Sequence, residues 1–303
     1  MENSVQIVEV GPRDGLQSEP EQLSTETKVQ FIERAVAAGI RRVEVASFVH
    51  PKRVPQMADA EAILEALPRD ESVSYIGLIM NQKGFERAAA ARVDEVGFVV
   101  VASDSFNRRN QGVGTAESLA VWRDIAAAAR EAGIRAVATI GAAFGCPFEG
   151  EVAEQRVVDI ASELADSGPG EIGLADSIGV GVPAQVNSLV AKVRKALPGV
   201  PVRCHFHNTR NTGLANAYVA VQAGVASLDA SIGGIGGCPF APAATGNIPT
   251  EDLLYMLDRS GIETGVSIER TIEASRWLAE QLGRAVPAML PKAGVFPAGP
   301  PAA

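Results

Sequence analysis

The sequence predicts an α/β fold, a single (β/α)8 TIM barrel, on three observations. Short segments rich in β-branched residues alternate along the chain with longer, Ala-rich amphipathic segments. The alternation repeats eight times, at spacings of about 25–40 residues. No shift in composition marks a second domain, although 303 residues would on length alone favour two. A doubly wound open sheet is the alternative, since periodicity alone does not close a barrel.

The eight expected strands are rich in Val and Ile and end beside polar or Gly-rich segments. They span 5–10, 42–47, 73–80, 95–101, 135–142, 171–175, 202–206 and 227–232. The expected helices follow them at 24–38, 55–67, 83–91, 115–132, 151–167, 183–197, 211–224 and 249–260. Ser24 before the first helix, Gly39 after it and Pro183 in a first turn are typical helix boundaries.

A further helix is expected over 268–283, after the eighth strand–helix unit. We therefore expect residues 1–285 to form one catalytic barrel with its additional C-terminal helix. Residues 286–303 contain five prolines and no charged side chain after Lys292, which predicts an irregular tail.

Composition excludes several classes of protein. The net charge of −9 argues against a nucleic-acid partner or a polybasic membrane contact. No apolar run approaches the roughly 20 residues of a membrane helix, and the first four residues are too short and acidic for a targeting segment. Three widely separated cysteines suggest no disulfide framework. We expect a cytoplasmic protein.

Polar side chains gather where the expected strands end. The first strand runs into Arg13 and Asp14, and the seventh ends in His205 and His207. The eighth is followed by a Gly-rich loop that contains Cys238 and, further on, Asn247. Catalytic groups of (β/α)8 barrels lie at this end of the strands.

Strand alternation predicts which side chains point into the barrel. With the apolar set Val8 and Val10 facing the helices, Glu9 would point inward, as would Glu44, Arg203 and both histidines. Buried charges are costly unless they are paired or bound to metal. An internal ion-pair network that serves the fold alone is the other explanation.

The His-x-His pair favours a metal site. Two imidazoles on one face of a strand suit two adjacent ligands of one cation, and a closed barrel brings Asp14 and Asn247 beside them. A mixed nitrogen and oxygen set without thiolate favours Mg²⁺ or Mn²⁺ over structural zinc. Open coordination positions would imply Lewis-acid catalysis on an oxygen-rich substrate. A chance pair on a solvated face is the alternative.

Other motifs are absent or ambiguous. The sequence has no phosphate-binding Gly-Lys loop, no dinucleotide fingerprint after the first strand and no Gly-x-Ser-x-Gly elbow. Gly-Cys-Pro-Phe occurs at 145–148 and 237–240, and the first copy is expected to be a plain turn. Alternation assigns Cys204 to the packed face, whereas spacing alone leaves Cys238 open between loop filler and catalyst.

Five segments together resemble the 3-hydroxy-3-methylglutaryl-CoA (HMG-CoA) lyase family, within the metal-dependent barrels that include isopropylmalate synthases. The resemblance covers nearly the whole chain. Its segments are EVGPRDGLQ (9–17), SFVHPKRVPQM (47–57), GCPFEG (145–150), DSIGVG (176–181) and GGIGGCPFAPAATGN (233–247).

The resemblance implies a retro-Claisen cleavage of HMG-CoA, or a close 3-hydroxyacyl-CoA, to acetyl-CoA and acetoacetate, as in leucine degradation. The metal ligands that it implies are Asp14, His205, His207 and Asn247. It also implies that Asp14 assists removal of the substrate hydroxyl proton, that Arg13 neutralises the thioester enolate and that Cys238 protonates the acetyl-CoA carbanion. Glu9 and Glu44 would hold Arg13 and the metal ligands in place.

One departure bears on the substrate. After His207 the chain reads Asn208-Thr209-Arg210, where the family commonly has an Asp-Thr-Tyr run. A differently branched or citramalyl-type thioester is therefore an open alternative. A Claisen-type synthase that condenses acetyl-CoA with a 2-oxo acid and a non-catalytic CoA- or metal-binding relative are also alternatives.

Binding of CoA is the least specific expectation. Its phosphates would contact basic and polar residues after the second and fourth strands, which are Lys52, Arg53, Arg108, Arg109 and Asn110. The alternative is that these residues are ordinary solvated surface groups that bind no ligand. A homo-oligomer is expected, as is common for barrel enzymes of this kind.

Overall fold

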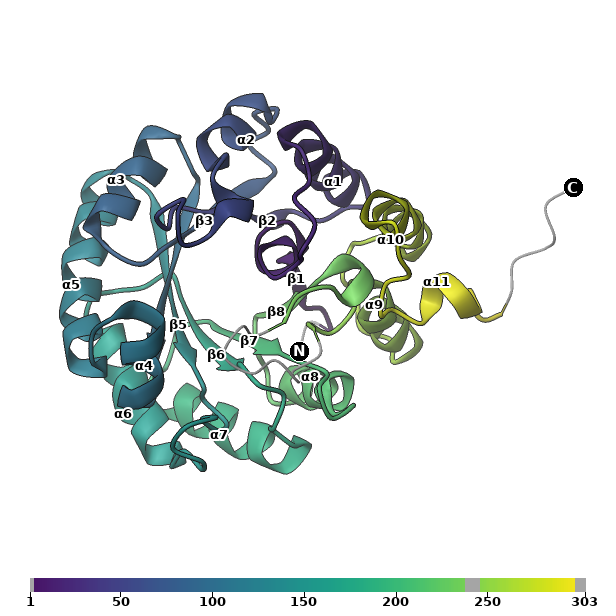
Figure 1. The fold of residues 1–303 in the computed structure, drawn as a ribbon. Coiled ribbons are helices and arrows are strands. Elements are labelled where there is room, and N and C mark those ends of the chain that lie inside the picture. Colours follow the sequence, from purple (N-terminus) through teal and green to yellow (C-terminus); the bar gives the residue numbers. More distant parts are fainter. Residues whose placement is uncertain (1–2, 238–245, 298–303) are drawn as a thin grey trace, which may run out of the picture.

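The computed structural model describes residues 3–237 and 246–297 and has the expected closed barrel (Figure 1). Eight parallel strands pair in chain order, and β1 closes the barrel against β8. The strands are β1 (Gln6–Glu9), β2 (Arg42–Ser47), β3 (Ser74–Ile79), β4 (Glu95–Val101), β5 (Arg135–Gly141), β6 (Glu171–Asp176), β7 (Val202–Phe206) and β8 (Ser227–Ala230). Closure excludes the doubly wound alternative.

The helices surround the strands as an outer layer (Figure 1). They are α1 (Thr25–Ala37), α2 (Ala60–Ala66), α3 (Gln82–Ala90), α4 (Asp104–Gln111), α5 (Thr115–Glu131), α6 (Glu154–Ala165), α7 (Pro183–Ala196), α8 (Gly213–Gln222), α9 (Thr250–Arg259), α10 (Ile268–Leu282) and α11 (Leu290–Ala293). The expected helix over 268–283 is confirmed as α10. Within the described ranges, no helix combines the length and apolar character needed to cross a bilayer.

Three segments differ from expectation. Residues 55–67 form a 3-10 turn, Pro55–Met57, followed by the shorter α2. Helix α4 was not expected, because its sequence DSFNRRNQ lacks an apolar stripe. The tail is not wholly irregular: α11 forms in it, and the Met289 and Leu290 amides donate to Asp252.

The predicted facing of β1 is wrong. Val8 is level with Arg42 of β2 and with Asp229 of β8, whose side chains point inward, and Val8 and Val10 pack with Ile76 inside the barrel. Ile7 and Glu9 consequently face the helices. The error arose because both faces of this strand carry apolar residues, and Val8 and Val10, which form a small cluster with Ile76, are the inner set.

The predicted facing of β2 and β7 is confirmed. Val43, Val45 and Cys204 belong to the core between strands and helices, and Cys204 is fully buried. Glu44 and Arg203 point inward and are buried there. The fold thus concentrates charged side chains in the barrel interior, below and around the carboxyl ends of the strands.

Candidate active site

A π-helical turn, Gly11–Gly15, carries the first two site residues. The Val10 carbonyl accepts hydrogen bonds from the Asp14 amide at 2.7 Å and from the Gly15 amide at 3.2 Å, which tightens the chain directly after β1. Such single π-helical turns are rare and are frequent at functional sites. The turn directs Arg13 and Asp14 toward the mouth of the barrel.

Asp14, His205 and His207 form a cluster that could hold a metal ion. One ligand atom from each lies within 4.8 Å of the others. His205 Nε2 is 3.9 Å from Asp14 Oδ2, and the two imidazole ring centres are 5.1 Å apart. The strand spacing that predicted adjacent imidazoles is therefore confirmed.

Asn247 completes the cluster from the other side. Its backbone bridges that of His207, and its Nδ2 donates to Asp14 Oδ2 at 2.9 Å and to the Ile235 carbonyl at 3.1 Å. Asn247 Oδ1 and His207 Nδ1 are buried and have no hydrogen-bond partner among the described residues. Unpaired buried acceptors are costly, so a bound cation fits this donor set.

Arg13 lies between two carboxylates. Its Nη1 is 2.7 Å from Asp14 Oδ1 and its Nη2 is 2.6 Å from Glu44 Oε2. Burial alone would lower the pKa of Arg13, but the two carboxylates raise it. The guanidinium is thus a fixed positive charge beside the cluster of Asp14, His205 and His207, and it is paired with Glu44.

Asp14 and His207 have different protonation states because of the charges around them. Burial would raise the pKa of Asp14, but Arg13 and the two histidines lower it to about 2. For His207, burial and the neighbouring His205 lower the pKa to about 4. Asp14 is therefore an anion and His207 a neutral imidazole near neutral pH, the forms that bind a cation.

Glu9 does not occupy its expected place. Its carboxylate lies outside the barrel and accepts hydrogen bonds from the Gly11 amide at 2.8 Å, the Ile232 amide at 2.9 Å and Thr250 Oγ1 at 2.7 Å. The expectation that Glu9 points into the barrel is wrong, because Val8 and Val10 are the inner residues of β1 and Glu9 is on the opposite face of the strand. Glu9 instead ties together the two loops that follow β1 and β8.

The cluster lies in a cavity of about 1150 Å³ at the carboxyl ends of the strands. Its lining includes four of the five expected CoA-binding residues, Arg53, Arg108, Arg109 and Asn110. Lys52 is exposed on the turn after β2 and is not among the described lining residues. The basic side chains on the loop after β2 and on α4 therefore face the same opening as Arg13.

Two expectations concern neighbouring loops. Cys238 lies outside the described residues, as does most of the second Gly-Cys-Pro-Phe copy. The first copy is a turn, as expected: Cys146 and Gly150 exchange two backbone hydrogen bonds.

The segment after His207, which departs from the family pattern, is held by backbone contacts. Arg210 donates to the carbonyls of Ile178 and Gly179, and Asn208 Oδ1 accepts from the Gly213 amide.

Sequence reasoning missed Asp229. Its Oδ2 is 3.0 Å from His205 Nδ1, and its Oδ1 accepts from Arg203 Nε. A usable signal was present: a carboxylate in the middle of the apolar run around Leu228 and Ala230 has to be paired. Arg203 was placed correctly inside the barrel, but its partner was not identified.

The fold and this site define a barrel enzyme whose charged cluster lies at the carboxyl ends of the strands. The chain belongs to the HMGL-like family, whose model matches residues 4–278. It is an acyl-CoA lyase that cleaves a carbon–carbon bond, as its relatives are named.

Three relatives illustrate the similarity. The (R)-citramalyl-CoA lyase of Chloroflexus aurantiacus is 47% identical, over 97% of this chain and 96% of that protein. The hydroxymethylglutaryl-CoA lyase of Bacillus subtilis is 38% identical, over 93% and 95%. The solved structure of an HMG-CoA lyase of Acinetobacter baumannii, in complex with coenzyme A and 3-methylmalate, has a TM-score of 0.95 at 37% identity, over 99% of this chain and 98% of that one.

Proposed function

We propose that the chain is a divalent-metal-dependent lyase that cleaves HMG-CoA, or a close 3-hydroxyacyl-CoA, by a retro-Claisen reaction. The observation that carries the proposal is the cluster of Asp14, His205 and His207 beside the doubly paired Arg13. The cation would be Mg²⁺ or Mn²⁺, because the donor set offers nitrogen and oxygen without thiolate. Similarity to named acyl-CoA lyases over nearly the whole chain supports the reaction class.

In this reaction the substrate 3-hydroxyl loses its proton and the bond between C2 and C3 breaks. The C3 fragment leaves as a ketone, and the thioester fragment is an enolate that gains a proton to become acetyl-CoA. A bound divalent cation would supply a positive charge that favours ionisation of the hydroxyl. Every other requirement falls on the side chains of this chain.

Asp14 and Arg13 would divide that work. Asp14, whose pKa is about 2, is an anion that accepts the hydroxyl proton or passes it to a water. Arg13 would stabilise the negative charge that develops on the thioester oxygen, because its guanidinium is held in place before the reaction by Glu44. Cys238 is proposed to return the proton to the acetyl-CoA carbanion, as the family resemblance implies.

CoA would enter across the side of the cavity that is lined by helix α4 and by the loop that follows β2. Arg53, Arg108 and Arg109 line that side, and the Arg109 guanidinium carbon lies 4.2 Å from the centre of the Phe148 ring. Guanidinium groups at a cavity mouth suit the phosphates of CoA. A relative whose structure was solved in complex with coenzyme A supports a CoA thioester as substrate.

A second substrate is favoured by the relative at 47% identity, which is named an (R)-citramalyl-CoA lyase. Citramalyl-CoA differs from HMG-CoA by one methylene before the distal carboxylate, and its cleavage gives pyruvate in place of acetoacetate. One methylene in a pocket is commonly worth a factor of about 10–200 in kcat/KM, so the two are separable.

The test is to incubate the purified chain with Mg²⁺ and each thioester, following acetyl-CoA together with acetoacetate or pyruvate. Release of acetyl-CoA and acetoacetate from HMG-CoA is the expected result. A kcat/KM at least about tenfold higher for (R)-citramalyl-CoA would assign that substrate in its place. Cleavage of neither thioester would overturn the proposal.

A further inference from the structure

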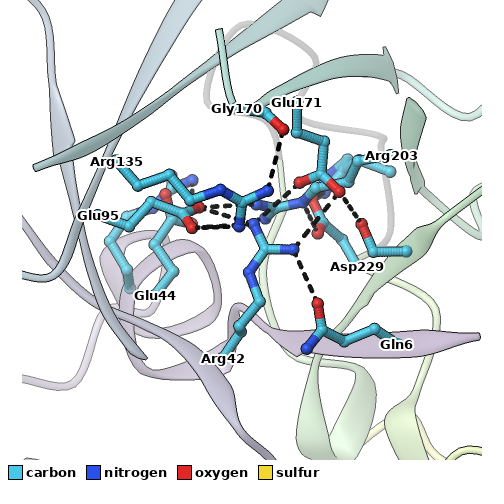
Figure 2. Close-up of polar contacts among 12 residues, drawn as sticks. Gln6, Arg42, Glu44, Glu95, Arg135, Gly170, Glu171, Arg203 and Asp229 are labelled. Atoms are coloured by element: carbon cyan, nitrogen blue, oxygen red, sulfur yellow. Dashed lines mark hydrogen bonds and ion pairs between the residues drawn. The ribbon is translucent and has the colours of Figure 1, made fainter. Parts of the chain in front are cut away.

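Below the cation cluster, the barrel interior is filled by ion pairs (Figure 2). Arg42 Nη2 lies 2.8 Å from Glu95 Oε1 and 2.9 Å from Glu171 Oε2, and Arg135 reaches Glu95 Oε2 at 2.8 Å from the lower rim. Arg203 Nη1 is 3.9 Å from Glu95 Oε1. Arg203 therefore connects this lower layer to the residues above it.

Asp229 forms the next connection. One of its oxygens accepts from Arg203 Nε, and the other lies 3.0 Å from His205 Nδ1. Figure 2 shows the Arg203 and Asp229 side chains next to each other on the β7–β8 side of the network. Both side chains are less than one-tenth exposed, so water does not compete strongly for either contact.

Strand register produces this arrangement. Arg203 of β7 is level with Ser227 of β8, and the next inward residues along these strands are His205 and Asp229. The carboxylate thus stands beside the imidazole and one layer above the guanidinium. The three side chains form a vertical series from the barrel floor to the cation cluster.

We propose that Asp229, held by Arg203, is a positioning residue that keeps the His205 proton on Nδ1 and turns the Nε2 lone pair toward Asp14. The inference rests on the cation site proposed above. A neutral imidazole carries one proton, and only its unprotonated nitrogen binds a cation. An ionised carboxylate accepts but does not donate, so Asp229 selects the binding-competent tautomer.

The two histidines differ in this respect. His207 Nδ1 is buried without a hydrogen-bond partner among the described residues, so no carboxylate of the described chain fixes its proton. His205 is oriented before a cation arrives, whereas the tautomer of His207 is left to the cation. Asp229 therefore acts on one ligand of the pair.

The Asp229→Asn variant would invert the His205 tautomer. Arg203 Nε only donates, so the Asn oxygen has to face Arg203 and its NH₂ group has to face His205. His205 Nδ1 would then accept, and the proton would lie on Nε2, where it blocks the cation. The variant changes the side-chain shape little, which separates orientation from packing.

The direct measurement is nitrogen-15 NMR of the histidine rings in the metal-free chain, followed to alkaline pH until each ring is neutral. An alkaline end point is needed because burial lowers the pKa of His205 but Asp229 and Asp14 raise it above that of an ordinary imidazole. The chain has three histidines, and the His50→Gln and His207→Gln variants identify two of them, leaving His205. The expected result is an Nδ1–H ring for His205 in the natural sequence and an Nε2–H ring in Asp229→Asn. An Nε2–H ring for His205 in the unmodified chain would overturn the proposal.

Affinity for Mn²⁺ is the second measurement, by titration of the same metal-free proteins. Asp229→Asn is expected to weaken binding by about 10–100-fold. Glu171→Gln is the matched control: it also neutralises an interior carboxylate, but one that contacts Arg42 and Ser227 and not His205. Its affinity should stay close to that of the unmodified chain, and an equal loss in both variants would contradict a role specific to Asp229.

Arg203→Lys covers the case in which Asp229→Asn does not fold. Lysine keeps the charge but removes the planar Nε donor that holds Asp229, so an intermediate loss of Mn²⁺ affinity is expected. An unchanged affinity and an unchanged His205 tautomer would exclude Arg203 from the positioning role. None of these measurements involves a thioester, so failure to cleave HMG-CoA or citramalyl-CoA would overturn the proposed function while leaving this inference intact.

Discussion

The positive charge of Arg13 is held in place by two carboxylates, since its Nη1 lies 2.7 Å from Asp14 and its Nη2 lies 2.6 Å from Glu44. Arg13→Gln removes the charge but keeps all proposed ligands. Turnover of the thioester should fall by at least about 10²–10³-fold, the loss typical of a removed charge-stabilising donor. Mn²⁺ binding should persist. Steady-state kinetics and metal titration on the same preparation measure both.

The control for this variant is Arg123→Gln. Arg123 pairs with Glu163 on the exposed side of α5 and α6, with more than half of its side chain in solvent. Its loss should leave turnover unchanged. Normal turnover in Arg13→Gln would remove Arg13 from the mechanism, and a loss of Mn²⁺ binding would show that the change had disrupted the cluster instead.

The sequence predicted correctly which side chains face the barrel interior where strand alternation was clear and the inward polar group has a partner there. His205 on β7, His207 directly after that strand and Glu44 on β2 all face inward as expected, because the apolar residues of those strands face the helices. Glu9 failed the same rule, since Val8 and Val10 pack inside the barrel with Ile76. Alternation assigns residues to two faces, but it does not say which face is inner when both sides are apolar.

The loop after β8 brings Asn247 against Asp14, and its Gly236 permits that approach. Gly236 has φ of +108°, and an added Cβ would lie 2.7 Å from Asn247 Nδ2 and 3.1 Å from the Asp14 carbonyl oxygen. Gly236→Ala should therefore displace Asn247 and weaken Mn²⁺ binding by at least about tenfold, as expected when a group that orients metal ligands is disturbed. Metal titration measures the effect.

Gly265→Ala is the matched control for this element. Gly265 also has a positive φ, of +71°, but an added Cβ meets no atom within 4 Å. Its substitution should cost about 1–3 kcal/mol in the free energy of unfolding, from backbone strain, and leave Mn²⁺ affinity unchanged. Equal metal affinities in the two variants would contradict the role given to Gly236.

Glu9 joins the loops after β1 and β8, and its ionisation should affect stability. Burial raises the pKa of Glu9 from 4.5 to about 8. Between these values the unfolded chain releases the proton while the folded chain keeps it, so this group lowers the free energy of unfolding as the pH rises. Glu9→Gln should lose less stability than the natural sequence between about pH 5 and about pH 8.

Denaturant unfolding at both pH values measures this difference. Glu33→Gln, on the exposed face of α1, is the control and should leave the pH dependence as it is. Glu251 has its pKa raised to about 7 by burial and contributes in the same direction, so comparison of Glu9→Gln with the natural sequence isolates the share of Glu9. Parallel pH profiles for the two proteins would contradict the prediction.

Prediction of whole elements followed the strength of their periodicity. The eight strands and the long helices α5, α7 and α10 were expected within a few residues of their ends, because each has a continuous apolar face. Helix α4 and the π-helical turn at Gly11–Gly15 were not expected. Both are short polar segments held by tertiary contacts, such as the Asn107 side chain bonded to the Val101 amide, which no local pattern reveals.

Across the whole molecule, the net charge of −9 opposes an anionic CoA ester. Attraction has to come from local groups, because exposed charges more than about 10 Å apart are largely screened at moderate salt. Arg53, Arg108 and Arg109 line the cavity mouth, and Arg13 lies deeper. The overall charge argued only against a nucleic-acid partner, whereas the position of a few arginines supports the proposed substrate.

The same charge imbalance exists inside the barrel and links metal binding to the stability of the whole fold. In the barrel interior, carboxylates outnumber the guanidinium groups that pair with them. The carboxylates are Asp14, Glu44, Glu95, Glu171 and Asp229, and the guanidinium groups are those of Arg13, Arg42 and Arg203. Arg135 at the lower rim adds a fourth guanidinium, which is still fewer than the carboxylates. A divalent cation at the cluster would offset this excess of negative charge. It should therefore bind the folded chain and not the unfolded one, which stabilises the fold.

At a free Mn²⁺ concentration about 100 times its dissociation constant, the free energy of unfolding should rise by about 2.7 kcal/mol. Removal of Mn²⁺ by a chelator should abolish this increment and leave a folded barrel, because Arg42 pairs with Glu95 and Glu171 without any cation. His207→Gln removes one ligand and should show a smaller increment at the same Mn²⁺ concentration. Unfolding curves that do not move with Mn²⁺ in the unmodified chain would contradict a cation site at these residues.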